Sequence, residues 1–292
     1  MADVAPTGLE IALAIGSDGV PQMVYVDAAQ NQVITGLWLA GHWSLAPLTT
    51  AGHSLRLAVG QDNRPHLSLI QQGRLIYWTK PGGVWQSEPI SPTGVTVGDA
   101  FLGLDSQGRP KVVYGGSGIE GLVVAVRQGA GQWTTESIPG RNMIAMALGP
   151  DDAVYLLHIT TRFEPGKPPW EFISLWLVEQ QGGNWQDSGL YEDLFMGTYP
   201  DGRLLFDAAG RLHIVNYGNG DRLYYHQRDV DGQWSSEGVA NVGGALALAV
   251  GSDGQPRVSS QVRSDLRLYT RELLWLDQHA LLPIIPVKSN TE

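Results

Sequence analysis

The sequence contains no cysteine, so disulfide bonds and thiolate metal sites are excluded. It has no apolar run near the roughly 20 residues that a membrane-spanning helix requires, and membrane insertion is therefore not expected. The first residues, MADVAPTG, lack the charged start and the apolar stretch of a signal peptide.

Positive charge is scarce as well. The chain has 19 Lys and Arg residues against 29 Asp and Glu residues, for a formal net charge of -10. Binding to nucleic-acid backbones needs a basic surface, so a nucleic-acid partner is excluded. Several catalytic motifs are missing too: the sequence has no Gly-x-Ser-x-Gly, no His-Glu-x-x-His and no Walker loop.

The motif Gly-x-Trp recurs along the chain, at 41–43, 83–85, 131–133, 183–185 and 232–234. An Asp- and Gly-rich turn followed by a short strand precedes each copy, as in GSDGVPQMVY (16–25). A sixth unit begins at GSDGQPRVSS (251–260) and ends in LYTRELLWLDQ (268–278), where the motif has become Leu-Leu-Trp. Steps of 42, 48, 52 and 49 residues indicate a propeller, a solenoid or an array.

Each repeat is rich in short runs of Val, Ile, Leu and Tyr that Gly, Pro, Asp and Asn interrupt, and no segment sustains a helical period. In the first copy four strands are predicted, at 9–15, 21–27, 34–40 and 43–49. Six copies of four antiparallel strands predict an all-β, six-bladed β-propeller. A β-solenoid is the alternative, but its coils are usually shorter. The predicted blades of this single domain, 1–292, cover about 7–50, 51–93, 94–140, 141–193, 194–241 and 242–287.

The glycine of Gly-x-Trp permits a tight turn between the third and fourth strands, and the tryptophan is expected to pack between blades. Direct stacking of one of these rings on a ligand is the alternative interpretation.

The repeat form Asp-x-x-Gly-x-Pro, Leu-x-Tyr, Gly-x-Trp resembles the repeats of bacterial BNR-like and lectin-like propellers over nearly the whole chain. The resemblance implies blades and a bacterial protein, with a secreted or cell-surface location favoured over a cytoplasmic one. The Asp-box of sialidases is not matched, since its nearest counterpart is DVDGQW (229–234). Fucose-binding propeller lectins are similar in architecture, but none of their sugar-binding residues can be assigned to positions of this chain.

The innermost strands predict where chemistry could lie. Positions four and six residues before the turn are apolar in every copy, and period two places them between blades. These positions are Ile15, Val59, Leu104, Leu148, Phe206 and Val250, and Leu13, Leu57, Leu102, Met146, Leu204 and Leu248. On the opposite, channel-facing side, charges interrupt the strands near one mouth: Glu10, Arg56, Asp99, Asp201 and Arg203.

Buried charge is costly unless it is paired or used, and three interpretations of this cluster remain open. The charges form a salt-bridged plug, or the arginines bind a carboxylate or sugar hydroxyls. In the third interpretation, Glu10, Asp99 and Asp201 offer oxygens to Ca²⁺, although the nearby arginines disfavour this. No cofactor is otherwise expected.

One long loop, 159–175, should project near the same mouth, because its Pro and Gly residues make it stiff. It carries Arg162 and Trp170, and Tyr199 is expected nearby. Trp170 is the best candidate in this loop for stacking on a sugar ring. At the opposite mouth, His66 and His213 follow the turns and are expected to be solvated strand ends.

The sequence therefore favours a binding protein over an enzyme, with a carbohydrate or a small acidic molecule as ligand. The predicted ligand-binding residues are Glu10, Arg56, Asp99, Arg162, Trp170, Tyr199, Asp201 and Arg203. Two alternatives stay open. One is a glycosidase or a metal-assisted, lactonase-type hydrolase at the charged mouth, and the other is a scaffold for protein partners.

Overall fold

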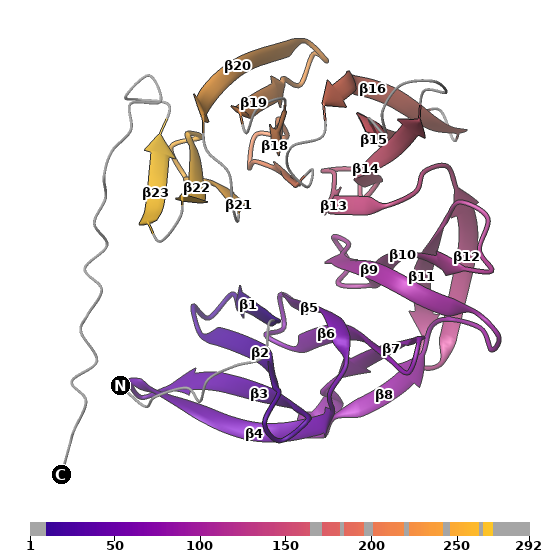
Figure 1. Ribbon diagram of the computed structural model, residues 1–292. Coiled ribbons are helices and arrows are strands. Elements are labelled where there is room, and N and C mark those ends of the chain that lie inside the picture. The colour runs from indigo at the N-terminus through magenta and orange to yellow at the C-terminus, as the bar shows by residue number, and fades with distance from the viewer. Residues whose placement is uncertain are drawn as a thin grey trace.

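Six antiparallel β-sheets surround one central axis and form a six-bladed β-propeller, which confirms the fold predicted from the repeats (Figure 1). The computed structural model describes residues 10–163, 171–181, 184–195, 201–218, 222–241, 246–262 and 265–270. Five sheets have four strands, and within the described residues the sixth has three. Across these ranges no helix is long and apolar enough to cross a membrane.

Each blade is a meander in which consecutive strands pair, with the first strand innermost. The first three blades contain β1 (Ile11–Ile15), β2 (Pro21–Asp27), β3 (Gln32–Leu39) and β4 (His42–Thr50); β5 (His53–Val59), β6 (Pro65–Gln71), β7 (Arg74–Thr79) and β8 (Gln86–Pro89); and β9 (Thr96–Leu104), β10 (Pro110–Ser117), β11 (Leu122–Gly129) and β12 (Gln132–Ile138). A short 3-10 helix, η1 (Pro81–Gly83), connects β7 to β8.

The last three blades continue the same order. They contain β13 (Met143–Leu148), β14 (Val154–Phe163), β15 (Glu171–Gln181) and β16 (Asn184–Phe195); β17 (Gly202–Phe206), β18 (Leu212–Tyr217), β19 (Arg222–Arg228) and β20 (Trp234–Asn241); and β21 (Leu246–Val250), β22 (Pro256–Val262) and β23 (Asp265–Thr270).

The turns explain why the repeats break into strands where they do. In the first blade the Asp18 carboxylate accepts the Val20 backbone N–H at 2.9 Å, and Gly19 adopts φ +75°. The glycines of the Gly-x-Trp turns also need positive φ, which is +83° at Gly41 and +83° at Gly232. A side chain would be strained there, so glycine recurs before the tryptophan.

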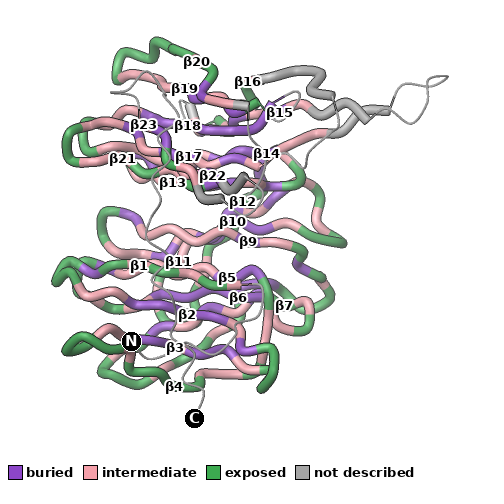
Figure 2. Tube along the Cα trace, turned by 60° about the vertical axis from the view of Figure 1, so that its left-hand side comes forward, coloured by how far each residue is buried: buried purple, intermediate pink, exposed green. Residues whose placement is uncertain are grey.

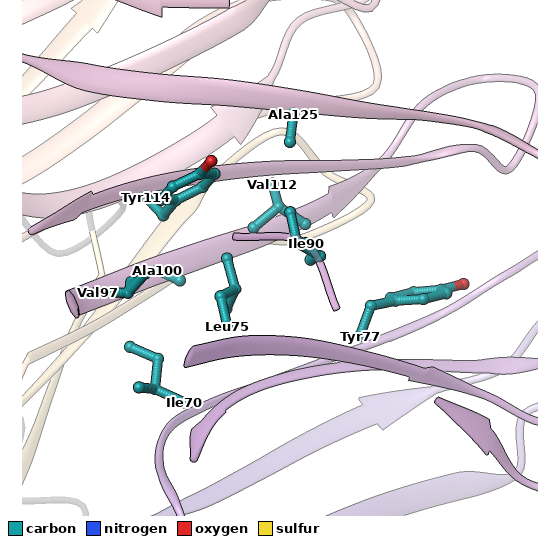
Figure 3. Close-up of a cluster of buried hydrophobic side chains, with 9 residues drawn as sticks. All are labelled: Ile70, Leu75, Tyr77, Ile90, Val97, Ala100, Val112, Tyr114 and Ala125. Carbon is teal, nitrogen blue, oxygen red and sulfur yellow. The ribbon is translucent and has the colours of Figure 1, made fainter. Parts of the chain in front are cut away.

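The core lies between the blades, where facing sheets interdigitate. Ile70, Leu75, Tyr77 and Ile90 of the second blade pack against a group from the third blade (Figure 3). That group consists of Val97, Ala100, Val112, Tyr114 and Ala125. Burial follows the middle strands, and the turns and outermost strands are exposed (Figure 2). The middle strands are therefore covered on both faces, as the fully buried β18 illustrates.

The predicted packing of the apolar positions six residues before the turn holds in the second to sixth blades. Leu57, Leu102, Met146, Leu204 and Leu248 all contact the core shared with the preceding blade.

The first blade departs from this pattern. Ile11, Leu13 and Ile15 are 61%, 60% and 62% exposed, so the expectation that Leu13 and Ile15 pack between blades is wrong for the described part of the chain. These residues lie on the side of the first blade that faces the sixth, and the described parts of the two blades stand apart there (Figure 1).

Candidate functional site

The charged channel mouth is shaped by β-bulges. The register of β5 shifts between His53 and Arg56 relative to β6, and β9 and β13 shift at the same end. Such a bulge turns side chains to the other face of a strand. Ser54, in a left-handed conformation with φ +56°, is buried and donates its hydroxyl to Asp99 of the next blade.

Arg56 is held in place from the third blade. Its Nη2 donates to Asp99 Oδ1 at 3.3 Å, and its guanidinium lies 4.5 Å from the centre of the Phe101 ring. This cation–π contact and ion pair join two of the predicted residues across a blade interface. Their side chains are 32% and 42% exposed, so the pair is partly solvated.

Asp201 and Arg203 form the second ion pair of the channel mouth. Arg203 lies in β17, and Asp201 directly precedes this strand. Asp201 also accepts the Gly202 backbone N–H at 2.9 Å. The two pairs line one cavity of about 470 Å³, together with Phe101 and residues of β13. Because each arginine has a carboxylate partner, the cavity carries no uncompensated charge among its described lining residues.

Glu10 lies at the start of the first blade and acts on the backbone. Its Oε2 accepts the Leu55 N–H of the second blade at 2.8 Å. It does not line the cavity with Asp99 and Asp201, each of which accepts the backbone N–H of the residue that follows it. Among the described residues, no three His, Asp or Glu side chains gather closely enough to hold a metal ion.

Three predicted ligand-binding residues are not placed here. The loop predicted at 159–175 is wrong in its bounds, because residues 159–163 and 171–175 are paired strands of β14 and β15. Trp170 and Tyr199 lie outside the described residues, and Arg162 is described only as a strand residue of β14, paired with Phe172. They stay predictions.

The two histidines expected at solvated strand ends are instead core residues. His66 and His213 are 6% and 0% exposed, and each ring Nδ1 lies 2.6 Å from a tyrosine hydroxyl, that of Tyr77 or Tyr225. Asp207 lies 3.1 Å from Nε2 of His213. The expectation of a solvated strand end was wrong because both faces of these second strands are covered by neighbouring blades.

The tryptophans of the third and fourth blades tie neighbouring blades together. The indole N–H of Trp133 donates to Glu88 at 2.9 Å, and that of Trp185 donates to Glu136 at 2.7 Å. In both cases the acceptor belongs to the preceding blade and follows that blade's own tryptophan by three residues. These contacts agree with the predicted packing role between blades.

Trp234 of the fifth blade makes no such hydrogen bond to the described residues of the fourth blade. The corresponding residue of the fourth blade is Ser188, too short to reach as Glu88 does, and the Trp234 side chain is 42% exposed. A cavity of about 560 Å³ opens at this interface. We call it the Trp234 pocket, with Tyr155, Glu179, Ser188, Arg228 and Trp234 among its lining residues.

The polar centre of the Trp234 pocket is an ion pair. Arg228 Nη1 donates to Glu179 Oε1 at 2.8 Å, and the two side chains are 16% and 5% exposed. The guanidinium lies 5.5 Å from the Tyr155 ring centre and 5.4 Å from that of Trp234. Burial disfavours the charge on Arg228, but the bond to Glu179 outweighs burial and raises the pKa of Arg228. The cation is therefore fixed in position and always charged.

The Trp234 pocket was missed from the sequence because its signal is a small residue in a repeat. The third residue after each Gly-x-Trp tryptophan is Ala46, Glu88, Glu136, Ser188 or Glu237. Only alignment of the blades reveals that Ser188 replaces a glutamate, and only the structure reveals what that glutamate does.

No family model matches the chain, and no curated protein matches it. Solved structures do match in fold. The α-L-arabinanase of Penicillium chrysogenum complexed with arabinobiose is 12% identical, with a TM-score of 0.56 and coverage of 89% of this chain and 90% of that one. Virginiamycin B lyase from Staphylococcus aureus is 10% identical, with a TM-score of 0.58 and coverage of 88% of this chain and 82% of that one. A polysaccharide lyase described as an ulvan lyase is 13% identical, with a TM-score of 0.58 and coverage of 89% of this chain and 78% of that one. At this identity the likeness establishes the β-propeller fold alone.

Proposed function

We propose that this propeller is a lectin-like carbohydrate-binding protein and that the Trp234 pocket is its binding site. The observation that carries the proposal is the half-exposed Trp234 ring beside the fixed Arg228–Glu179 pair. A sugar presents an apolar C–H face and a rim of hydroxyls. An aromatic ring covers the first, and a guanidinium and a carboxylate bind the second.

The channel mouth supports the proposal less well. Its arginines are each matched by a carboxylate, and the aromatic ring described there, Phe101, is covered by Arg56. The fold neighbours that act on saccharides, the arabinanase and the ulvan lyase, support carbohydrate as the ligand class. Hydrolysis of a saccharide at the channel mouth is the alternative function, and the test below can detect it.

The test is binding of the purified protein to a panel of neutral saccharides, followed by titration of those that bind. Trp234→Ala should weaken binding about tenfold or more, equivalent to about 1.4 kcal/mol. The matched control is Gln233→Ala, which changes the exposed neighbouring residue. Equal affinity of Trp234→Ala and the wild type would refute the site, and cleavage of a bound saccharide would favour the hydrolase.

A further inference from the structure

At the four described interfaces from the first to the fifth blade, the residue three positions after a tryptophan separates those with an indole hydrogen bond from those with an open pocket. Glu88 and Glu136 tie the following tryptophans, Trp133 and Trp185, by accepting their indole N–H groups. Besides Ser188, the other small residue at this position is Ala46 of the first blade. The next tryptophan, Trp85 of the second blade, makes no indole hydrogen bond to the described residues, as expected without a glutamate acceptor.

A cavity of about 480 Å³ opens at this interface too. We call it the Trp85 pocket, with Ala46, Asp18, Asp62, Arg64, Lys80 and Trp85 among its lining residues. It is flanked by the same kinds of turn as the Trp234 pocket, those between first and second and between third and fourth strands. The two pockets therefore occupy equivalent positions on one face of the propeller.

The charges of the Trp85 pocket differ from those of the Trp234 pocket. Lys80 Nζ lies 5.9 Å from the Trp85 ring centre, and no carboxylate of the described residues lies within ion-pair distance of it. The other cation, Arg64, pairs with Asp62 at 3.3 Å. Asp18, on the first blade, accepts the backbone N–H of Val20 in its own turn. The pocket thus combines one partly buried aromatic ring with one exposed cation that has no ion-pair partner among the described residues.

We propose that the Trp85 pocket is a second ligand site, specific for a carboxylate-bearing saccharide such as a uronic-acid sugar. The Trp85 ring stacks on the sugar, and the Lys80 ammonium binds the carboxylate. Charge recognition separates this site from the Trp234 pocket, where the Arg228 charge is already matched by Glu179. The inference extends the proposed carbohydrate binding.

The experiment uses the full chain and uronic-acid oligosaccharides, each paired with its methyl ester, which keeps the shape and removes the charge. Calorimetric titration should show that the wild type binds the acid about tenfold more tightly than the methyl ester. Lys80→Gln should bind the acid about tenfold more weakly than the wild type does. Ala46→Glu should abolish this binding, because a glutamate there fills the pocket and accepts the Trp85 indole N–H. Ala46→Ser is the matched control, since it keeps the residue small and should bind normally.

The outcomes separate this inference from the proposed function. Unchanged acid binding in Ala46→Glu would overturn the site, and equal binding of acid and ester would overturn its specificity. Ser188→Glu should close only the Trp234 pocket and leave acid binding intact. A protein that binds neutral saccharides through Trp234 but no uronic acid would refute the second site alone. A protein that binds uronic acids but no neutral saccharide would refute the proposed function of the Trp234 pocket and leave the second site standing.

Discussion

Glu88 accepts several hydrogen bonds at the interface between the second and third blades. Besides Trp133, it accepts Arg127 Nε at 2.7 Å and the Gly131 backbone N–H at 2.7 Å. Burial raises the pKa of this carboxyl, but the bonds that it accepts outweigh burial and lower the pKa below its usual value. Its stabilising effect is therefore present above the ordinary glutamate pKa and is lost as the pH falls through the lowered pKa.

We expect Glu88→Ala to lower the free energy of unfolding at neutral pH by about 2 kcal/mol, because it leaves the Arg127 guanidinium and two N–H groups unmatched. Glu136→Ala should cost clearly less, since Glu136 is exposed and accepts one tryptophan N–H. Urea unfolding of both variants provides the measurement. An equal loss in the two variants would contradict the role assigned to Glu88.

At the scale of the element, the second and third strands of the blades carry buried histidines. Burial lowers the pKa of His66 to about 4 and that of His226 to about 4. His226 lies between Asn216 and Ser236, with ring nitrogens 3.0 Å and 2.7 Å from their side-chain oxygens. Both rings are neutral in the folded protein at pH values where the unfolded chain takes up a proton.

Stability should therefore fall as the pH is lowered from about 6.5 to about 4, by roughly 1.4 kcal/mol per pH unit for each histidine. The sign follows because only the unfolded chain binds the proton in this window. His226→Gln should reduce the slope of the unfolding free energy against pH by the contribution of one histidine. Denaturant titrations at several pH values between about 4 and about 6.5 would measure this slope. An unchanged slope in that variant would mean that His226 is protonated in the folded state.

These elements also show what the sequence could predict. The Gly-x-Trp spacing predicts the blades, because a turn that needs positive φ and a ring that fills a blade interface recur with each sheet. The burial of His66 could not be read from period two, since inner strands of a propeller are covered on both faces. The pairing of Arg56 with Asp99 needed the register between blades, which a bulge in β5 changes.

At the scale of the whole molecule, the side of the first blade that faces the sixth differs from the other blade sides among the described residues. The register positions of the first blade that face the sixth hold Ile11, Leu13 and Ile15, all exposed, whereas the equivalent Leu204 of the fifth blade is 7% exposed. Within the described part of the chain, the same sequence pattern thus gives a covered strand in the fifth blade and an uncovered strand in the first.

Paired substitutions measure this difference. Leu204→Ala should cost roughly 2–4 kcal/mol of unfolding free energy, as expected for a buried leucine. Leu13→Ala should cost less than about 0.5 kcal/mol, because little apolar surface is lost from the core. Thermal unfolding of the two variants at one pH compares them directly. A large loss in Leu13→Ala would indicate that this stripe is covered in solution.

Ala46 lies in β4 and Ser188 in β16, strands of the first and fourth blades on opposite sides of the ring (Figure 1). The pockets beside them therefore lie across the axis from each other. Both open on the face formed by the same turns. With both proposed sites occupied, the propeller is bivalent toward any surface that displays neutral and acidic sugars together. Its retention there would exceed either single affinity through effective concentration, and closing either pocket would reduce retention to that of one weak contact.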